Sequence, residues 1–371
     1  MSKKRIAILL HGGIGTGAFG QGIPILHRIA QKLSQIYVVE IYSHATPQVS
    51  IPSLNVYFPD PKIHGNNFRW WKLTKMLKSQ HSVAPYEAIL CFWGYPAGVI
   101  GTALAKYLRI PSIVYLLGGD SVGIKRPDYG IMHHPIKRFV AKWAYASASS
   151  VCVLSRFQQE QLANVGVNRS LMIIPWGIEL DVYAYRERFP RGASIRFINV
   201  AHLTPVKDQH TLLKTFAIIN QRIESTLSIV GFDAGMKRAL LDQCARLNID
   251  DKVSFQDMVP YAEMRKHYES ADVMLHTSLS EAQGLVINEA AACGLLIGGT
   301  KVGLIHDLSD NECVRVEIGQ FTELADEICR VLNDQEVWRS KIRAARKWCE
   351  DHDINWTVSE IAREIEYVTE N

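Results

Sequence analysis

The amino-acid sequence predicts an α/β protein with two domains, each built around a parallel β-sheet. Its 371 residues are more than one hydrophobic core usually organises. Short apolar runs, each the length of a buried strand, recur in both halves and alternate with longer helical patterns. One stretch shows the unit compactly, with a strand at Val273–Leu275, a helix at Leu285–Cys293 and a strand at Leu295–Ile297. This order of elements is typical of a parallel α/β sheet.

The first half carries six apolar runs of strand length. The predicted strands are Arg5–Leu10, Tyr37–Ser43, Ala88–Phe92, Ile113–Leu117, Val151–Ser155 and Met172–Ile174. A helix is expected through Ile25–Leu33. Residues 88–105 contain no charge, as a membrane span would, but Gly94, Pro96 and Gly98 interrupt them. We therefore predict a buried strand, a turn and a core helix there.

The second half begins after a charged stretch, Tyr183–Ser194, that contains Pro190 and Gly192 and is expected to be the interdomain linker. Beyond it we predict strands at Phe197–Ala201 and Leu227–Gly231. The predicted domains are residues 1–183, residues 195–350 and a C-terminal helix within 351–371.

Composition and charge limit the cellular context. The seven cysteines are scattered, odd in number and lack any C-x-x-C pair, which favours reduced core thiols in a cytoplasmic protein. No signal peptide is expected, because the apolar run after the basic start is too short. Residues 1–182 hold 19 Lys/Arg and 8 Asp/Glu, a net charge of +11, whereas residues 183–371 carry −7. This asymmetry predicts that the first half meets an anionic surface.

The loop at 276–285 is the strongest candidate for chemistry. The backbone N–H groups of Gln283, Gly284 and Leu285 would lie at a helix N-terminus, which is a ready site for a diphosphate. Glu281 precedes this turn and Glu289 follows inside the helix. Two carboxylates that flank an anion site fit a nucleotide sugar, with its ribose on one side and hexose on the other. The alternative is a solvated acidic loop followed by a surface glutamate.

The stretch Ser-Glu-Ala-Gln-Gly-Leu-Val-Ile-Asn-Glu-Ala-Ala-Ala-Cys-Gly, residues 280–294, resembles the Glu-x7-Glu signature of retaining glycosyltransferases of family 4. The resemblance implies the GT-B fold, with two Rossmann-like domains that face a central cleft and a last helix that crosses back to the first domain. It also implies that Glu281 contacts the donor hexose and Glu289 holds the ribose hydroxyls. The similarity is strong from 199 to 308 and diffuse before 150.

The same resemblance implies further donor contacts in the second domain. Lys207 matches a family lysine that faces the diphosphate, but His202 stands where the family has arginine. Because an imidazole lacks the permanent charge and the bidentate fork of arginine, this departure is expected to lower the rate. Gly231 ends a strand beside this loop, and the nucleotide base is expected near Met258 and Val259.

Two positions of the first domain are also implicated. The family has a Gly-Gly loop after the first strand, which corresponds to Gly13 and its neighbour. Asp120 follows Gly118-Gly119 where the family often has His-Gly-x-Asp, and Leu117 replaces that histidine. Asp120 is expected either to orient a substrate hydroxyl or to cap the next turn.

The resemblance implies a retaining hexosyltransferase that uses a UDP-, GDP- or ADP-sugar to extend a glycan or a lipid-linked acceptor. No cofactor and no metal ion are expected. One alternative is a non-catalytic nucleotide-sugar-binding partner of another enzyme. Another is a dehydrogenase, because Gly15-x-Gly17-x-x-Gly20 matches the dinucleotide fingerprint and Glu40 lies about the right distance beyond it. This fingerprint begins several residues after the strand end, which disfavours it.

Two basic segments of the first half, residues 62–81 and 133–143, combine Lys/Arg with tryptophan. Trp70 and Trp71 lie among Arg69, Lys72 and Lys75, a pattern that suits peripheral attachment to the anionic inner face of a membrane. The alternative is an ordinary solvated helix. No nucleic-acid motif is present. The adjacent His133 and His134 are expected to point in opposite directions and to make a poor metal site.

Overall fold

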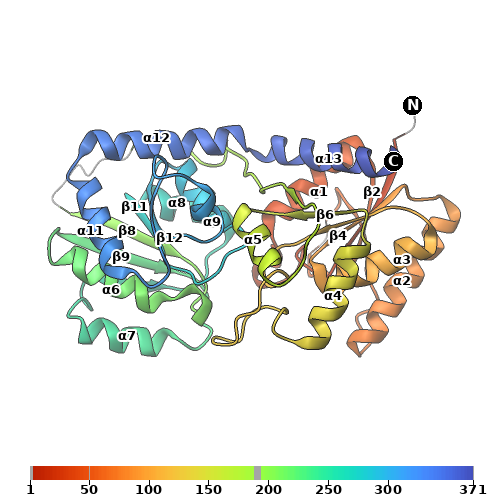
Figure 1. The fold of residues 1–371 in the computed structure, drawn as a ribbon, viewed down its shortest axis with the longest axis horizontal. Helices are drawn as coiled ribbons and strands as arrows, with labels where there is room; N and C mark the ends of the chain where they lie inside the picture. Colours follow the sequence, from red (N-terminus) through yellow and green to blue (C-terminus); the bar gives the residue numbers. More distant parts are fainter. Residues whose placement is uncertain (1–2, 50, 188–193, 371) are drawn as a thin grey trace. The chain divides into compact units, whose positions relative to one another are not determined.

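The computed structural model describes residues 3–49, 51–187 and 194–370, and the chain divides into two compact units (Figure 1). The N-terminal unit comprises Met1–Leu154, Gln158–Trp176 and Ile354–Asn371. The C-terminal unit comprises Ser155–Phe157 and Gly177–Asp353. Part of the expected linker, residues 188–193, lies outside the described residues.

The N-terminal unit contains a sheet of seven parallel strands in the order β3-β2-β1-β4-β5-β6-β7. Their bounds are β1 Arg5–Leu10, β2 Val38–Ser43, β3 Asn55–Tyr57, β4 Ala88–Phe92, β5 Ser112–Tyr115, β6 Ser150–Val153 and β7 Met172–Ile173. The central strands are apolar except for Arg5 and Ser112 at their starts, because both faces of the sheet are covered.

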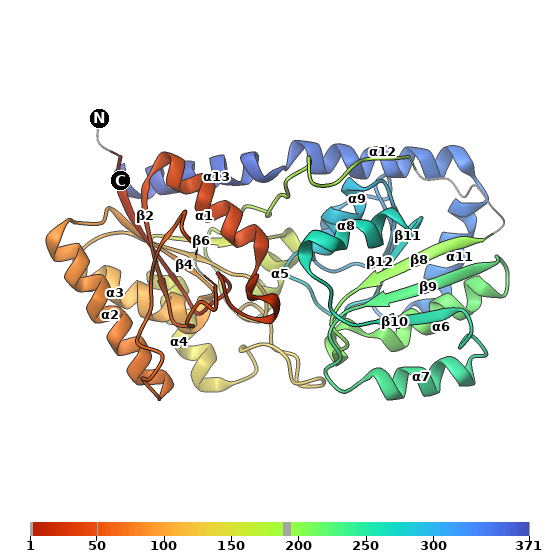
Figure 2. The same ribbon diagram turned by 180° about the vertical axis from the view of Figure 1, so that it is seen from behind.

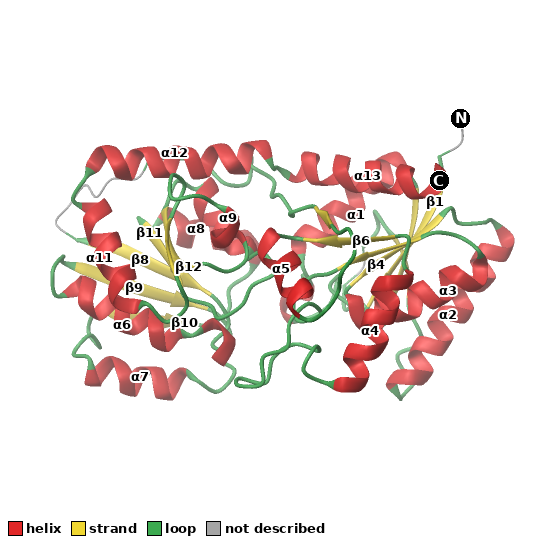
Figure 3. Ribbon diagram, in the orientation of Figure 1, coloured by secondary structure: helices red, strands yellow, loops and turns green. Residues whose placement is uncertain are grey.

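Helices follow most of these strands along the chain (Figure 3). They are η1 Ala18–Gly20, α1 Pro24–Ile36, α2 Asn66–Val83, η2 Gly94–Gly98, α3 Val99–Leu108, α4 Pro135–Ser147, α5 Arg156–Asn164 and the C-terminal α13 Ile354–Glu370. Helices α2, α3 and α4 pack their buried side chains on one face of the sheet in a single core cluster. Helices α1 and α13 pack against each other, and each contacts a strand. The uncharged stretch 88–105 folds as β4, η2 and α3, as predicted from its glycines and proline.

The last helix, α13, is tied to the N-terminal unit by polar contacts as well as by packing. The hydroxyl of Tyr37 donates to Glu366 at 2.8 Å, and Lys4 forms an ion pair with the same carboxylate. The hydroxyl of Thr357 donates to the carbonyl oxygen of Pro175 at 2.8 Å. The final segment of the chain therefore completes the unit that the first residues begin.

The C-terminal unit contains six parallel strands in the order β10-β9-β8-β11-β12-β13 (Figure 2). Their bounds are β8 Ile195–Val200, β9 Ser225–Val230, β10 Val253–Gln256, β11 Val273–His276, β12 Leu296–Thr300 and β13 Val314–Val316. Chain order starts at β8, runs outward to β10, and then resumes at β11 on the other side of β8. This is the strand order of a Rossmann domain.

Helices cover both faces of this second sheet. They are η3 Pro205–Lys207, α6 Gln209–Asn220, α7 Lys237–Arg246, α8 Tyr261–Glu269, α9 Leu285–Ala292, α10 Leu304–Asp307, α11 Phe321–Leu332 and α12 Gln335–Asp351. Helices α6, α7 and α11 contribute to one core cluster. Helices α8, α9 and α10 contribute to the other. The predicted α/β fold with two Rossmann-like units is confirmed.

Two expectations about exposed groups on α2 are wrong. Trp70 is 5% exposed and stacks on the ring of His44, with ring centroids 4.6 Å apart, so it is a core residue. The guanidinium group of Arg69 donates to the carbonyl oxygen of His44 at 2.8 Å and to the hydroxyl of Thr46 at 3.0 Å. A helical wheel could not reveal these contacts, because the partners lie on a separate loop. Trp71 is 45% exposed, as expected.

The seven cysteines are all buried and none of them forms a disulfide within the described residues, which agrees with the expected reduced core thiols. In the described part of the chain, no helix combines the length and the apolar character needed to cross a membrane.

Candidate functional site

The candidate site lies at the carboxyl ends of β8 and β11 in the C-terminal sheet. These strands are neighbours, yet the connections that leave them run in opposite directions across the sheet. Such a switch point opens a crevice between the two loops, and ligands of open parallel sheets bind there. The loop after β8 carries His202 and Lys207, and the loop after β11 carries Glu281.

The two loops are joined by backbone contacts. The N–H of Leu279 donates to the carbonyl oxygen of Val206 at 2.8 Å, and the Thr277 hydroxyl donates to the carbonyl oxygen of Asp208 at 2.9 Å. Asp208 has a φ of 46° and caps α6, because its carboxylate accepts from the N–H of Thr211 at 3.2 Å. This fixed turn holds Lys207 next to Glu281.

Glu281 is the centre of a charged cluster. Its Oε1 accepts from Lys207 Nζ at 2.5 Å, from His276 Nε2 at 2.8 Å and from the Ser278 hydroxyl at 2.7 Å. Burial raises the pKa of Glu281, but the charge of Lys207 and the hydrogen bond from His276 outweigh it and hold that pKa well below its usual range. The carboxylate is therefore ionised at physiological pH and is held ready as a hydrogen-bond acceptor.

Neither His276 nor Ser278 was predicted from the sequence as a site residue. His276 is the last residue of β11, and its side chain is 1% exposed. The sequence does contain a signal for His276. It is a polar residue at the end of an otherwise apolar strand, five positions before Glu281. Its Nδ1 is buried and has no hydrogen-bond partner within the described residues. This histidine orients the carboxylate of Glu281.

The N-terminus of α9 faces the same loop. Gly284 precedes the helix with a φ of 86°, and a Cβ at this position would lie 2.9 Å from the side chain of Ile287. No side chain of the described chain caps the helix. The carbonyl oxygen of Gln283 accepts from the N–H of Leu304 at 2.7 Å, which fixes the turn. The N–H group of Leu285 starts the helix, where an anion is stabilised by the helix dipole.

Glu289 lies deeper in α9, within a group of tyrosines that sequence analysis also missed. Tyr268 donates to its Oε2 at 2.7 Å, and the hydroxyl of Tyr183 donates to that of Tyr261 at 2.7 Å. Burial raises the pKa of Glu289 to about 7, although hydrogen bonds from Tyr268 and from the two other tyrosines act in the opposite direction. Glu289 therefore takes up a proton near neutral pH.

This raised pKa predicts a pH-dependent stability. Folded protein keeps the proton of Glu289 up to about pH 7, whereas the unfolded chain loses it near 4.5, so stability falls as pH rises through this window. Between pH 5 and pH 8 we expect the wild type to lose roughly 2.5 kcal/mol relative to Glu289→Gln. Urea unfolding at both pH values measures this difference. Glu263→Gln, at an exposed position of α8, should follow the wild type. Equal pH dependence of wild type and Glu289→Gln would contradict the expectation.

The remaining predicted donor residues lie around the ends of β8 to β10. His202 is exposed beside Phe232, whose N–H donates to His202 Nδ1 at 3.4 Å. Partial burial of the ring and the charge of Lys207 lower the pKa of His202, so the imidazole is neutral at pH 7. Gly231 is required by packing, since a Cβ there would lie 2.0 Å from the carbonyl oxygen of Ala201.

Met258 and Val259 follow β10 in the loop that leads to α8. Both are half-buried, and Val259 packs against the apolar cluster under α8 and α9. The structure thus gathers His202, Lys207, Glu281, Gln283, Gly284 and Leu285 at the loops after β8 and β11, and places Met258 and Val259 in the loop after β10.

Gly13 and Asp120 belong to the N-terminal unit. Gly13 has a φ of 95°, and its N–H donates to the Thr16 hydroxyl at 3.0 Å. Asp120 is 5% exposed, and its Oδ2 accepts from the N–H of Gly94 at 2.6 Å and from that of Leu117 at 3.4 Å. These contacts support the turn-capping interpretation of Asp120, because the carboxylate already binds backbone.

The dinucleotide fingerprint has a different setting from that of a nicotinamide site. β1 ends at Leu10 and α1 begins at Pro24, so the glycines lie within a long loop and not at a strand–helix turn. Glu40 stands inside β2, where it forms an ion pair with Arg5 at 2.9 Å and accepts a hydrogen bond from Tyr86. A ribose would have to compete with these buried partners.

Known proteins are similar to this chain in the C-terminal unit, where the cluster around Glu281 lies. Residues 185–348 match the family model described as Glycosyl transferases group 1. N-acetyl-alpha-D-glucosaminyl L-malate synthase of Bacillus anthracis is 32% identical over 155 residues, which are 40% of this chain and 39% of that protein. D-inositol 3-phosphate glycosyltransferase of Pseudarthrobacter chlorophenolicus is 24% identical over 322 residues, covering 78% of this chain and 76% of that one.

Among solved structures, Anabaena Alr3699/HepE in complex with UDP and glucose superposes with a TM-score of 0.76 at 20% identity, covering 98% of this chain and 100% of that one. The fold is therefore that of the GT-B glycosyltransferases. The segment that contains the cluster around Glu281 is similar to the group 1 glycosyl transferases.

Proposed function

We propose that the protein is a retaining hexosyltransferase that uses a nucleoside diphosphate sugar as donor and a glycan or lipid-linked molecule as acceptor. The observation that carries the proposal is the Lys207–Glu281 pair at the switch point of the C-terminal sheet, beside the uncapped start of α9. One cation and one helix N-terminus offer two independent sources of positive potential for a diphosphate. The carboxylate of Glu281 is the acceptor for a hexose hydroxyl.

Lys207 has a defined part in the proposed reaction. Its ammonium group is neutralised by Glu281, so the incoming diphosphate and the carboxylate would share it. As the bond between the anomeric carbon and the phosphate oxygen breaks, negative charge grows on the phosphate, and Lys207 stabilises that charge. The acceptor oxygen attacks the anomeric carbon on the face that the phosphate leaves, and its proton passes to the departing phosphate. These cationic groups neutralise the diphosphate in this scheme without a metal ion.

The experiment that tests the function has two stages. Thermal unfolding with UDP, GDP, ADP and their sugars identifies the donor, because a ligand at 100 times its dissociation constant stabilises by about 2.7 kcal/mol. Transfer to an added acceptor is then followed by NMR of the anomeric proton. Retention of configuration supports the proposal, and inversion would refute the proposed mechanism.

A second candidate, a non-catalytic nucleotide-sugar-binding partner, is favoured by one observation. His202 is neutral where the resemblance implies a permanent cation, which weakens stabilisation of the leaving group. Donor binding without transfer or donor hydrolysis, at enzyme concentrations equal to the donor, would establish this alternative.

We further propose that the N-terminal unit attaches to an anionic membrane, mainly through α4. Three large apolar side chains of this helix are exposed, namely Ile136 by 81%, Phe139 by 75% and Trp143 by 40%. Arg138 and Lys142 line the same shallow groove as Phe139 and Trp143. Apolar side chains among basic ones are the pattern of a helix that lies in the membrane interface.

Helix α2 contributes a second basic surface, on the same covered face of the sheet as α4. Lys72 Nζ and Lys75 Nζ lie 5.5 Å and 4.1 Å from the ring centroid of Trp71, which leaves these charges near the surface. Lys78 Nζ lies 3.9 Å from the ring of Tyr107. Arg69 is excluded from this surface because its guanidinium group binds backbone.

Replacing Lys72, Lys75 and Lys78 together by serine should lower binding to anionic liposomes about a hundredfold. Each basic residue near such a surface contributes about 1 kcal/mol, and salt screens the attraction. Co-sedimentation with phosphatidylserine vesicles measures the change. Replacing Ile136 and Phe139 by serine should weaken binding to anionic and zwitterionic vesicles alike.

Donor affinity is the control for these variants, because the candidate donor site lies in the other unit. Equal sedimentation of wild type and both variants would remove the membrane proposal. A soluble acceptor, such as the L-malate or inositol phosphate in the names of the two relatives, would then be favoured.

A further inference from the structure

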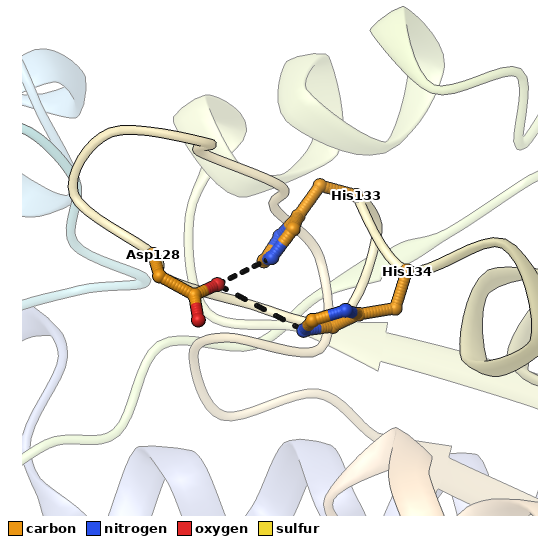
Figure 4. Close-up of side chains that lie close together, drawn as sticks. All are labelled: Asp128, His133 and His134. Atoms are coloured by element: carbon orange, nitrogen blue, oxygen red, sulfur yellow. Dashed lines mark ion pairs between the residues drawn. The ribbon is translucent and has the colours of Figure 1, made fainter.

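The loop between β5 and α4 brings three potential metal ligands together in the N-terminal unit (Figure 4). They are Asp128, His133 and His134. The sequence expectation that the two adjacent histidines point in opposite directions is wrong. Their ring centroids lie 3.9 Å apart, and both rings face the carboxylate of Asp128. The alternation of side chains that underlies the expectation holds for strands, whereas these residues lie in a turn just before a helix.

The loop has a defined backbone that presents the three residues. Ile124 and Tyr129 exchange two backbone hydrogen bonds of 2.9 Å, which form a small hairpin with Asp128 near its end. The N–H of Ile131 donates to the carbonyl oxygen of Gly119 at 2.7 Å, and so closes the hairpin onto the start of the loop. The two histidines then lead directly into α4, which starts at Pro135. Because these bonds fix the backbone, rotation of the three side chains is enough to bring their ligand atoms around one ion.

The distances suit a small transition-metal ion. Asp128 Oδ1 lies 2.5 Å from His133 Nε2 and 3.9 Å from His134 Nε2, and one ligand atom of each residue falls within 4.8 Å of the others. Bonds of about 2.1 Å in a tetrahedral site place two ligand atoms about 3.4 Å apart. The distance from Asp128 Oδ1 to His133 Nε2 is shorter than this value, and the distance to His134 Nε2 is longer. To hold an ion between the three groups, the distance between His133 Nε2 and Asp128 Oδ1 would have to increase by about 0.9 Å.

The polar groups here are incompletely satisfied. The side chain of His133 is 11% exposed, and its Nδ1 is buried without a hydrogen-bond partner in the described chain. Asp128 is 76% exposed on its side chain, so an ion can enter from solvent. Against binding, Lys125 and Arg126 precede the carboxylate in the same loop and repel cations. They weaken the site without removing its ligands.

We propose that Asp128, His133 and His134 form a binding site for a divalent transition-metal ion of the zinc class. Two imidazoles and one carboxylate match the donor set that such ions prefer, whereas Ca²⁺ and Mg²⁺ prefer oxygen ligands alone. Three protein ligands leave one position for water. The bound ion would tie the hairpin to the first turn of α4. It plays no part in the proposed transfer reaction, so this inference does not rest on the proposed function.

The test is titration of the full-length protein, without a histidine tag, with ZnCl₂ in a calorimeter. One saturable site is expected. Asp128→Asn, His133→Gln and His134→Gln should each lower the affinity at least tenfold. His64→Gln, at an exposed position of the same unit, is the matched control and should leave it unchanged. MgCl₂ should give no comparable heat.

A second measurement does not depend on binding heat. Co²⁺ in a four-coordinate site absorbs visible light strongly, whereas six-coordinate hydrated Co²⁺ does so weakly. Wild-type protein should show the strong band, and excess Zn²⁺ should remove it. Each variant is first checked by circular dichroism without metal, so that loss of folding is separated from loss of ligands. Zinc binding that survives all three substitutions, or that is absent from the folded wild type, would overturn the proposal.

Discussion

Replacing Glu281 by glutamine is expected to lower kcat/KM for glycosyl transfer by about 10- to 150-fold. The carboxylate accepts three hydrogen bonds, one of them from Lys207, and is the acceptor proposed for the hexose. Loss of a charge-assisted hydrogen bond to substrate costs about 1.5–3 kcal/mol, which corresponds to this range. Initial rates measured over a range of donor concentrations give the change.

The same substitution should leave binding of the bare nucleoside diphosphate unchanged or stronger. In the wild type, Glu281 both neutralises Lys207 and repels the diphosphate, so removing the charge frees the ammonium group. Glu281→Gln also breaks a largely buried ion pair, and we expect a loss of stability of about 3 kcal/mol. Assays at a temperature where circular dichroism shows the variant folded remove this effect. Wild-type turnover in Glu281→Gln would show that the site is misassigned.

Replacing Lys207 by alanine should have the opposite effect on the nucleoside diphosphate, with a drop in affinity of about a hundredfold. The variant loses the cation and also leaves the carboxylate of Glu281 without its closest partner, next to the diphosphate. Each effect weakens binding, and together they amount to about 3 kcal/mol. Calorimetric titration with the nucleoside diphosphate found in the thermal screen measures the loss.

The pH dependence of the Lys207→Ala variant gives an internal check. The charge of Lys207 helps to hold the pKa of Glu281 below its usual range, so this pKa rises when lysine is removed. Affinity of the variant should therefore improve as pH falls, because protonated Glu281 no longer repels the ligand. Lys301→Ala, which breaks the surface ion pair with Glu317, is the control and should bind normally. The double variant with Glu281→Gln should regain part of the lost affinity, since the two residues are in contact.

Much of the fold followed from local pattern. Apolar runs at 5–10 and 88–92 match β1 and β4. Central parallel strands are buried on both faces, so they appear in the sequence as nearly continuous apolar runs whose ends are easy to place. The local structure around Glu281 was also predicted from the sequence, because a strand, a glycine with positive φ and a helix follow one another within a few residues.

What could not be predicted depends on contacts between distant segments. The tyrosines around Glu289 come from positions 183, 261 and 268, and no spacing in the sequence links them to α9. Trp70 was expected at a surface because a helical wheel does not say which face meets the sheet. The ligand cluster at Asp128 was missed for a related reason, since the hairpin that turns the carboxylate toward the histidines is set by backbone bonds to Gly119 and Ile124.

The place of α13 has a consequence for how the chain is made. The N-terminal unit is completed by residues 354–371, whose buried Val358, Ile361 and Ile365 form part of its interior. During synthesis the first 176 residues leave the ribosome long before these side chains exist, and translation proceeds at about 5–20 residues per second. The unit that emerges first is thus finished last, after the whole C-terminal unit. A nascent chain should keep an apolar strip uncovered for many seconds, where a chaperone can bind, and a stop codon before Ile354 should yield an aggregating product.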